Sequence, residues 1–298
     1  MRVASNSVSD SMLRQIQQLT TDQAKLQLQV SSGRRITQPE DDPAAIGRVL
    51  NLQSEQRQLA QYVRNADRAM ALAQTSYSGL QGLKKVSDRA SELATLGTGA
   101  LSPDAMKTYA TEVDQLLEQA VQLANTKQAG DYIYGGTAVD APPFSITRDA
   151  DGKIASVAFV GNTEQTSIPL SEASSVSPYT SAATNTGLAD FISGLVALRD
   201  ALTSGDTDAV RAVQPALTAA EDAIIGAMAD NGGVQTRIEA AQSQQADRAT
   251  SLESSISAES AADLPSTIVK LSQTQTAYEA ALASATKIMN LTILDYLR

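Results

Sequence analysis

Apolar residues recur at alternating steps of four and three near both ends of the chain. Near the start, the stripe consists of Met12, Ile16, Leu19, Gln23, Leu26 and Val30. Near the end, it consists of Ile268, Leu271, Gln275, Tyr278, Leu282, Ala285 and Met289. This spacing places one narrow apolar seam on a helix, which is the surface that a coiled coil buries. The pattern therefore predicts two terminal helices that pair with each other or with other helices.

The same stripes are also typical of the buried face of an ordinary helical bundle, so spacing alone leaves both interpretations open. The energetics favour assembly. A seam offers only about five large side chains for burial, and their burial must offset the conformational entropy of ordering the whole helix. We therefore expect the two ends to be poorly ordered in a free subunit and to become ordered when copies pack together.

Between the two seams, the pattern predicts long helices. The first helix should end where Ser31–Arg34 interrupts the stripe. Asp42 is a natural N-cap and Pro43 suits the first position of a helix, so a long helix is predicted to begin there and to run to about residue 97. We expect this helix to bend near Gly79 or Gly82.

A second helix is predicted over residues 103–130, where the amphipathic pattern is clearest, and it should form an antiparallel hairpin with the long helix before it. From residue 131 to residue 186, glycine and proline become frequent and alternation replaces the helical period. Strands are expected at 145–147 and 154–160, with 166–170 as an edge strand and a loop from 171 to 186.

Helices are predicted again from Leu188, with a turn at Thr203–Asp206 and a break at Asn231–Gly233. The run that starts at Val234 then leads into the C-terminal seam. Helices, strands and helices thus follow one another, and a seam lies at each end. This order implies that the chain runs outward and returns.

The predicted fold is mainly α: an elongated antiparallel helical bundle with terminal coiled-coil helices and a small β module at the far tip. We expect three regions. Residues 1–42 with 263–298 form a terminal coiled-coil assembly region, residues 43–130 with 187–262 form a helical rod domain, and residues 131–186 form the β-rich tip module.

Composition excludes several classes of function. The 298 residues include no cysteine and no histidine, so thiolate and imidazole chemistry and disulfides are excluded. The net charge of −10 argues against a nucleic-acid partner. Asp149–Gly152 resembles the start of a calcium loop, but Lys153 stands where a further oxygen ligand is needed, so a hairpin turn is the better interpretation. We expect no enzymatic activity, no cofactor and no bound metal.

The first thirty residues lack the apolar core of a secretory signal. No stretch of the sequence approaches the roughly 20 apolar residues of a membrane span. We therefore expect no insertion into a membrane and no cleaved signal peptide.

Three parts of the sequence resemble the bacterial flagellin family. Ser31–Ile36 followed by Asp41–Ala45 resembles the flagellin signature between the terminal helix and the next domain. Ala124–Thr126 with Gly130–Gly136 resembles the junction proteins of the family rather than the filament-forming flagellins. Asn290–Arg298 resembles the C-terminal tail of both. The chain is identified from these motifs as a member of the flagellin family.

The resemblance implies a structural role in the bacterial flagellum, joining the hook to the filament and templating flagellin assembly. It also implies export through the flagellar type III channel to an extracellular location. The implied partners are copies of the chain in a helical array, the other hook–filament junction protein, flagellin and a flagellar export chaperone.

The pattern and the resemblance suggest the same assembly residues. In the expected interface, Met12, Ile16, Leu19, Leu26 and Val30 face Ile268, Leu271, Tyr278, Leu282 and Met289. Arg34, Arg35, Asp41 and Asp42 are expected to fix the bend between the terminal region and the rod. Salt bridges among these four residues and simple helix capping are both compatible with the sequence.

Two other interpretations stay open. The chain could be a filament-forming flagellin, from which the junction proteins differ in the Gly130–Phe144 segment. It could also be an independent coiled-coil signalling or adaptor rod, which would form a stable dimer in solution.

Overall fold

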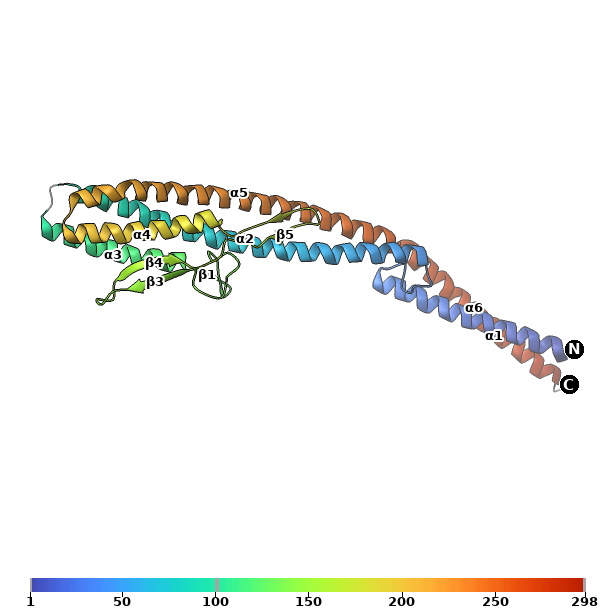
Figure 1. Cartoon of the computed structure of the whole chain (residues 1–298). Coiled ribbons are helices and arrows are strands. Elements are labelled where there is room, and N and C mark those ends of the chain that lie inside the picture. Colours follow the sequence, from blue (N-terminus) through green and yellow to red (C-terminus); the bar gives the residue numbers. More distant parts are fainter. Residues whose placement is uncertain (1, 100–101, 297–298) are drawn as a thin grey trace. The chain divides into compact units, whose positions relative to one another are not determined.

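A computed structural model describes residues 2–99 and 102–296, and the side chains of residues 10–99 and 102–287. The helices are α1 (Arg2–Ser32), α2 (Pro43–Gly97), α3 (Pro103–Ala124), α4 (Ala182–Ser204), α5 (Thr207–Ser260) and α6 (Leu264–Tyr296) (Figure 1). The strands are β1 (Lys127–Gln128), β2 (Asp131–Tyr132), β3 (Phe144–Arg148), β4 (Ile154–Phe159), β5 (Ile168–Pro169) and β6 (Ser175–Val176). The prediction of a mainly α fold with a small β module is confirmed.

The chain divides into two compact units. A terminal unit contains the described residues up to Gln58 and those from Arg248 onward, and a middle unit contains Leu59–Asp247. In the terminal unit, α1 and α6 lie side by side (Figure 1). The three regions expected from the sequence stay a prediction. None of the helices within the described residues has the length and apolarity that a membrane crossing requires.

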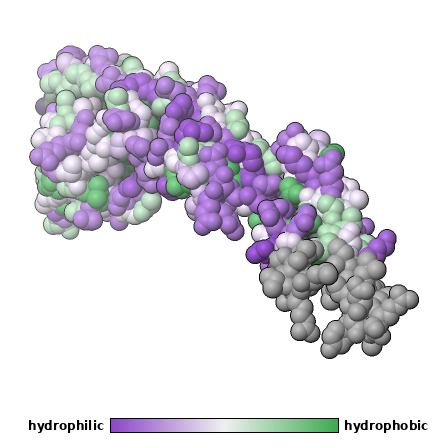
Figure 2. All heavy atoms as spheres, turned by 90° about the vertical axis from the view of Figure 1, so that its right-hand side faces the viewer, coloured by the Kyte–Doolittle hydropathy of each residue, from purple (hydrophilic) through white to green (hydrophobic). Residues whose placement is uncertain are grey.

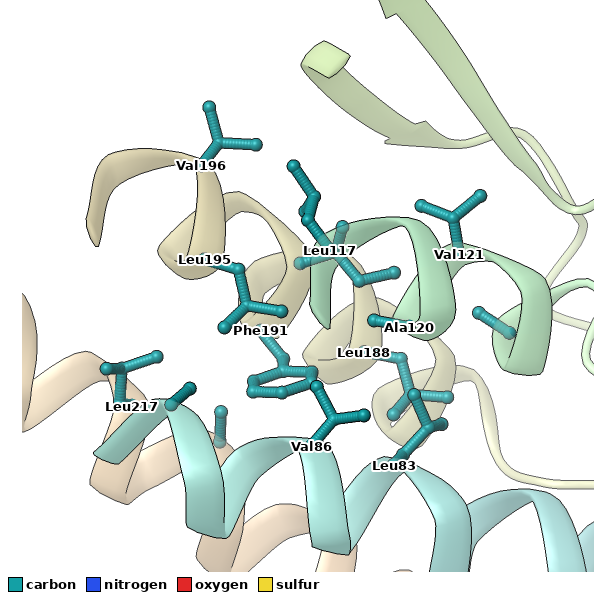
Figure 3. Close-up of a cluster of buried hydrophobic side chains, with 14 of the residues drawn as sticks. Leu83, Val86, Leu117, Ala120, Val121, Leu188, Phe191, Leu195, Val196 and Leu217 are labelled. Carbon is teal, nitrogen blue, oxygen red and sulfur yellow. The ribbon is translucent and has the colours of Figure 1, made fainter. Parts of the chain in front are cut away.

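The core of the middle unit lies where four helices meet. Leu83 and Val86 of α2, Leu117 and Ala120 of α3, Leu188, Phe191 and Leu195 of α4, and Leu217 of α5 pack in one cluster (Figure 3). The caps of α4 suit its sequence. Ser181 accepts a hydrogen bond from the Thr184 N–H at 3.1 Å, and Gly205 ends the helix with φ +72°.

Helix α2 continues unbroken through Gly79 and Gly82, and a bend at either glycine stays a prediction. Both glycines allow close approach of neighbouring parts. A Cβ at Gly79 would lie 2.3 Å from the hydroxyl oxygen of Tyr134, and one at Gly82 would lie 2.9 Å from Leu123. The buried Tyr134 hydroxyl donates to the carbonyl of Ser76 at 2.9 Å. The two glycines therefore serve packing.

Replacing Gly79 with alanine is expected to destabilise the middle unit by about 1–3 kcal/mol, because the new methyl group displaces the Tyr134 ring. The cost should be smaller in a chain that also carries Tyr134→Phe, which lacks the clashing oxygen atom. A double-mutant cycle of urea unfolding measures this coupling. Equal costs of Gly79→Ala in the two backgrounds would contradict the packing described here.

Helix α3 ends at Ala124, earlier than the predicted residue 130. The side-chain amide of Asn125 donates to the Phe144 carbonyl and accepts from the Phe144 N–H, both at 3.0 Å. These bonds divert the chain from the helix. Beyond them, β1 and β2 pair around Ala129 and Gly130, whose φ angles are +53° and +101°. Positive φ at both central residues is typical of a two-residue hairpin turn.

Helix α5 runs through Asn231–Gly233, so the predicted break is wrong. Asn231 is buried and accepts a hydrogen bond from the Gln235 side chain at 2.7 Å. Ala227 and Ile238 on either side are also buried. Packing of this face outweighs the low helix propensity of glycine.

Strands β3 and β4 form the predicted antiparallel hairpin around the Asp149–Gly152 turn. The strand expected within residues 166–170 is present as β5, but it pairs with β6 in a separate two-stranded sheet and does not join that hairpin. Ile154 is buried, and its carbonyl accepts from the Arg199 guanidinium of α4 at 2.6 Å.

The β module lies along the flanks of helices in the middle unit and not beyond their ends. The β5–β6 pair places Leu170 and Val176 against Ala66 and Ala69 of α2 and Ile238 of α5. The physical reason is burial, since each two-stranded pair has an apolar face too small to form a core alone.

Candidate assembly surface and connector

The half-buried residues of α1 follow the predicted stripe. Between residues 10 and 30 they are Met12, Ile16, Leu19, Gln23, Leu26, Gln29 and Val30. Every other residue in this range is exposed, and none is fully buried. Contact with α6 thus covers one face of α1 incompletely.

The face of α6 that is turned toward α1 differs from the predicted stripe at alternate stripe positions, where the residue one place earlier in the sequence is covered instead. From Thr267 onward, the covered residues are Thr267, Leu271, Thr274, Tyr278, Ala281 and Ala285. Ile268 and Leu282 were expected to face α1, but they are 52% and 40% exposed. Small residues let the two helices approach closely, and this turns the larger neighbours outward. The side chain of Met289 lies outside the described residues.

Large apolar side chains therefore remain on the outer faces of the pair. Leu13 and Leu28 of α1 are 56% and 54% exposed, and Val269 of α6 is 56% exposed. In Figure 2, green hydrophobic surface is interspersed with hydrophilic surface beside the grey terminal atoms. Apolar residues left uncovered in this way are typical of helices that contact further helices in an assembly.

The structure forms α1 and α6 as paired helices, whereas the sequence predicts poor order in a free subunit. The incomplete burial of the seam indicates a weak pair, because hydrophobic stabilisation grows with the apolar area removed from water. The weakness of the pair in solution stays a prediction.

The segments that follow α1 and precede α6 are joined by backbone hydrogen bonds. The Arg35 N–H donates to the Ser260 carbonyl at 2.8 Å, and the Ala262 N–H donates to the Gly33 carbonyl at 2.9 Å. Gly33 ends α1 with φ +68°, a conformation that favours glycine. We call these joined segments, residues 33–42 and 259–263, the connector.

Side chains reinforce the connector. Arg35 contacts the Asp42 carboxylate at 3.2 Å and donates to the Glu259 carbonyl at 3.0 Å. Arg48 of α2 binds both carboxylate oxygens of Glu259 at 2.9 Å. A two-point arginine–carboxylate contact fixes orientation as well as distance.

Asp41 and Asp42 act mainly through backbone N–H groups. Asp41 accepts from the N–H groups of Thr37 and Gln38 at 2.9 and 3.0 Å, and its other oxygen lies 2.7 Å from the Lys25 ammonium group. Asp42 caps α2 by accepting from the Ala45 N–H at 3.0 Å.

Of the four residues expected at the bend, three take part in these contacts. The side chain of Arg34 makes no hydrogen bond or ion pair within the described residues. Sequence reasoning missed Lys25, Arg48 and Glu259. Glu259 lies 211 positions from Arg48, and no local signal connects residues so far apart.

These contacts lower the pKa values of the connector carboxylates. The Lys25 ammonium and two backbone N–H groups hold the pKa of Asp41 well below its ordinary value of 3.8. The Ala45 N–H and Arg35 lower the pKa of Asp42, and Arg48 lowers that of Glu259 from 4.5. Each carboxylate is thus stabilised in its charged form.

The connector is expected to loosen in acid. A lowered folded-state pKa gives stabilisation that is fully present above the unfolded value and is lost as pH falls through the folded one. Amide exchange of residues 33–48 should therefore be slow at pH 6 and accelerate, relative to the intrinsic rate, below about pH 4. At neutral pH, Asp41→Asn should cost about 1 kcal/mol or less locally, because it removes the negative charge that pairs with Lys25.

Asp22→Asn is the matched control for this prediction, because the Asp22 side chain makes no hydrogen bond or ion pair within the described part of the chain. Its exchange pattern should match that of the unaltered chain. Acid-insensitive exchange at residues 33–48 would show that the carboxylates do not hold the connector.

Residues 3–137 match the family described as the bacterial flagellin N-terminal helical region. Flagellar hook-associated protein 3 of Salmonella typhimurium is 30% identical over 146 residues, which cover 48% of this chain and 46% of that protein. The chain thus spans about half the length of this relative.

Two solved structures share the fold. One is the structure of a putative flagellar hook-associated protein from Vibrio parahaemolyticus, with a TM-score of 0.66 and 17% identity over 74% of this chain and 99% of that one. The other is Bacillus cereus FlgL, with a TM-score of 0.60 and 21% identity over 70% of this chain and 99% of that one.

Over residues 3–137 the chain is thus similar to the N-terminal helical region of bacterial flagellins, and over 146 residues it is similar to flagellar hook-associated protein 3.

Proposed function

We propose that the chain is a structural component of the bacterial flagellum that joins the hook to the filament. The observation that carries this proposal is the α1–α6 pair, whose seam is only partly covered and whose outer faces keep exposed large apolar residues. The similarity to a relative named flagellar hook-associated protein 3 supports the same role.

The proposed mechanism is assembly through the terminal helices. Each copy presents the α1–α6 pair, and neighbouring copies bury the apolar residues that a single pair leaves in water. Ile268 and Leu282 contribute to the contacts between copies, and Leu271 and Tyr278 contribute to the pair itself. The connector keeps the pair at a fixed orientation to the first turns of α2, since Arg35 and Arg48 hold its two segments together.

The proposed partners follow from this role. Copies of the chain form a helical array, which contacts the other hook–filament junction protein on one side and templates flagellin on the other. A flagellar export chaperone binds the chain before export, and the chain acts outside the cell. The role requires no catalysis and no cofactor.

Deletion of the gene tests the proposal. The deletion strain should keep its hooks, lack filaments and release flagellin monomers into the medium. Electron microscopy and immunoblotting of the medium measure these three results. Intact filaments in the deletion strain would contradict the proposal, whereas loss of flagellin itself from the medium would favour a filament-forming flagellin.

A coiled-coil signalling rod is distinguished by its state in solution. Such a rod forms a stable dimer, and the proposed junction component should sediment as a monomer at micromolar concentration. Analytical ultracentrifugation of the purified chain separates the two interpretations.

A further inference from the structure

A small pocket of mixed lining lies beside the connector in the terminal unit. It has a volume of about 180 Å³. Its apolar part is formed by Ile36, Ile46, Val49, Leu50 and Ile256, and its polar part by Arg34, Thr37, Gln53 and Ser260. Ile36 is buried, whereas Leu50 is 56% exposed and marks the open side. A pocket of this size suits one aliphatic side chain.

Charge at the pocket narrows the choice of occupant. Arg34 also lines the pocket, and its guanidinium makes no ion pair within the described residues. The nearby carboxylates of Asp41 and Asp42 are engaged by Lys25 and Arg35. A complementary occupant therefore has an apolar side chain with a carboxylate close to it.

Leu282 of α6 meets this description. It is 40% exposed, and Glu279 lies one helical turn before it. The Glu279 carboxylate is exposed and makes no hydrogen bond or ion pair within the described residues. The nearest cation along the helix is Lys287, more than one turn away.

Most of the other exposed apolar residues of the pair fit less well, because they lie within one turn of a cation that Arg34 would repel. Val269 directly precedes Lys270, and Leu13 directly precedes Arg14. Leu28 lies one turn after Lys25. Leu264 is the exception, and the Asp263 carboxylate beside it already accepts a hydrogen bond from the Ser266 N–H. Charge thus favours Leu282 as the occupant.

The occupant comes from a different molecule. Helix α6 begins at Leu264, shortly after the pocket residue Ser260. Leu282 lies 18 positions further along this helix, a distance of about 27 Å at 1.5 Å per residue. A continuous helix cannot return its own Leu282 to the pocket.

We propose that the pocket beside the connector receives Leu282 of a second copy of this chain, with Arg34 paired to Glu279 of that copy. The inference rests on the proposed function, which brings copies together. It assigns one contact between neighbouring copies to a defined pair of sites.

Cysteine cross-linking tests the contact, since the chain contains no cysteine of its own. One bacterial strain produces two variants of the full chain, Leu50→Cys and Leu282→Cys, and its flagella are isolated and oxidised. The expected product is a disulfide-linked dimer that requires both variants. Ser284→Cys replaces Leu282→Cys as the control, because Ser284 is exposed about 200° around the helix and beyond the roughly 7 Å reach of a disulfide.

Charge reversal provides a second measurement that needs no cysteine. Arg34→Glu should lower the number of copies at the hook by about twofold to fivefold, as loss of an exposed ion pair does. Adding Glu279→Arg should restore it.

The outcomes separate the inference from the proposed function. If copies are present at the hook but the cross-link does not form, the assigned contact is wrong and the junction role stands. The same conclusion follows if Glu279→Arg does not rescue Arg34→Glu. Absence of the unaltered chain from the hook would contradict the junction role itself.

Discussion

Leu282→Asp is expected to abolish assembly while leaving the middle unit folded. Leu282 is 40% exposed in the single chain, so the folded subunit tolerates a charge there. In the assembled state the same side chain loses water, and an unpaired carboxylate costs several kcal/mol on burial. Loss of the leucine itself removes roughly 1 kcal/mol more per copy, since only the exposed 40% of its surface remains to be buried.

Electron microscopy of filaments and swimming in soft agar measure the first part of this result, and thermal unfolding of the purified chain measures the second. Ser284→Asp adds the same charge to an exposed position of the same helix and serves as the control. Filaments of normal number in the Leu282→Asp strain would show that this residue does not lie in the assembly interface.

Phe191→Ala is expected to have the largest effect on stability. Phe191 is 1% exposed and lies in the cluster where α2, α3, α4 and α5 of the middle unit meet (Figure 3). Truncating a buried phenylalanine leaves a cavity and costs about 3–5 kcal/mol. Urea unfolding followed by far-UV circular dichroism should show this loss in the transition of the middle unit.

Leu96→Ala provides the comparison for Phe191→Ala, because Leu96 lies on α2 in the same unit and is 43% exposed. It should change the free energy of unfolding by about 0.5 kcal/mol or less. A similar effect of the two substitutions would contradict the assignment of the core.

The sequence predicts the α1 stripe well and the α6 face only in part. On α1, all residues of the predicted stripe lie inward, although Leu13 and Leu28 remain exposed outside it. On α6, the sequence offers two adjacent stripes, one with Ile268 and Leu282 and one with Thr267 and Ala281. A prediction based on apolarity selects the larger residues, whereas close packing of two helices selects the smaller ones.

Helix ends were predictable where local chemistry determines them. Asp42 and Pro43 identify the start of α2, because capping depends on neighbours in the sequence. Gly232 and Gly233 misled the prediction for α5, since burial of the flanking residues outweighs local propensity. The contact of Arg48 with Glu259 depends on the tertiary fold and has no sequence signature.

The β module, too, was predictable where local sequence determines the structure and not where distant contacts determine it. Alternation and the Asp149–Gly152 turn predict the β3–β4 hairpin. The pairing of β5 with β6 was not predictable, because strands of two residues carry too little pattern. The location of both hairpins follows from buried residues such as Ile154 and Leu170, whose partners lie on distant helices.

The central claim is that the terminal helices gain most of their stability from neighbouring copies. Hydrogen–deuterium exchange with mass spectrometry tests it directly, on the dilute monomer and on isolated flagella. We expect residues 12–30 and 266–285 to exchange at least about a hundredfold faster in the monomer than the core of the middle unit, and to become protected in the assembly. Terminal helices in the monomer that are as protected as that core would contradict the claim.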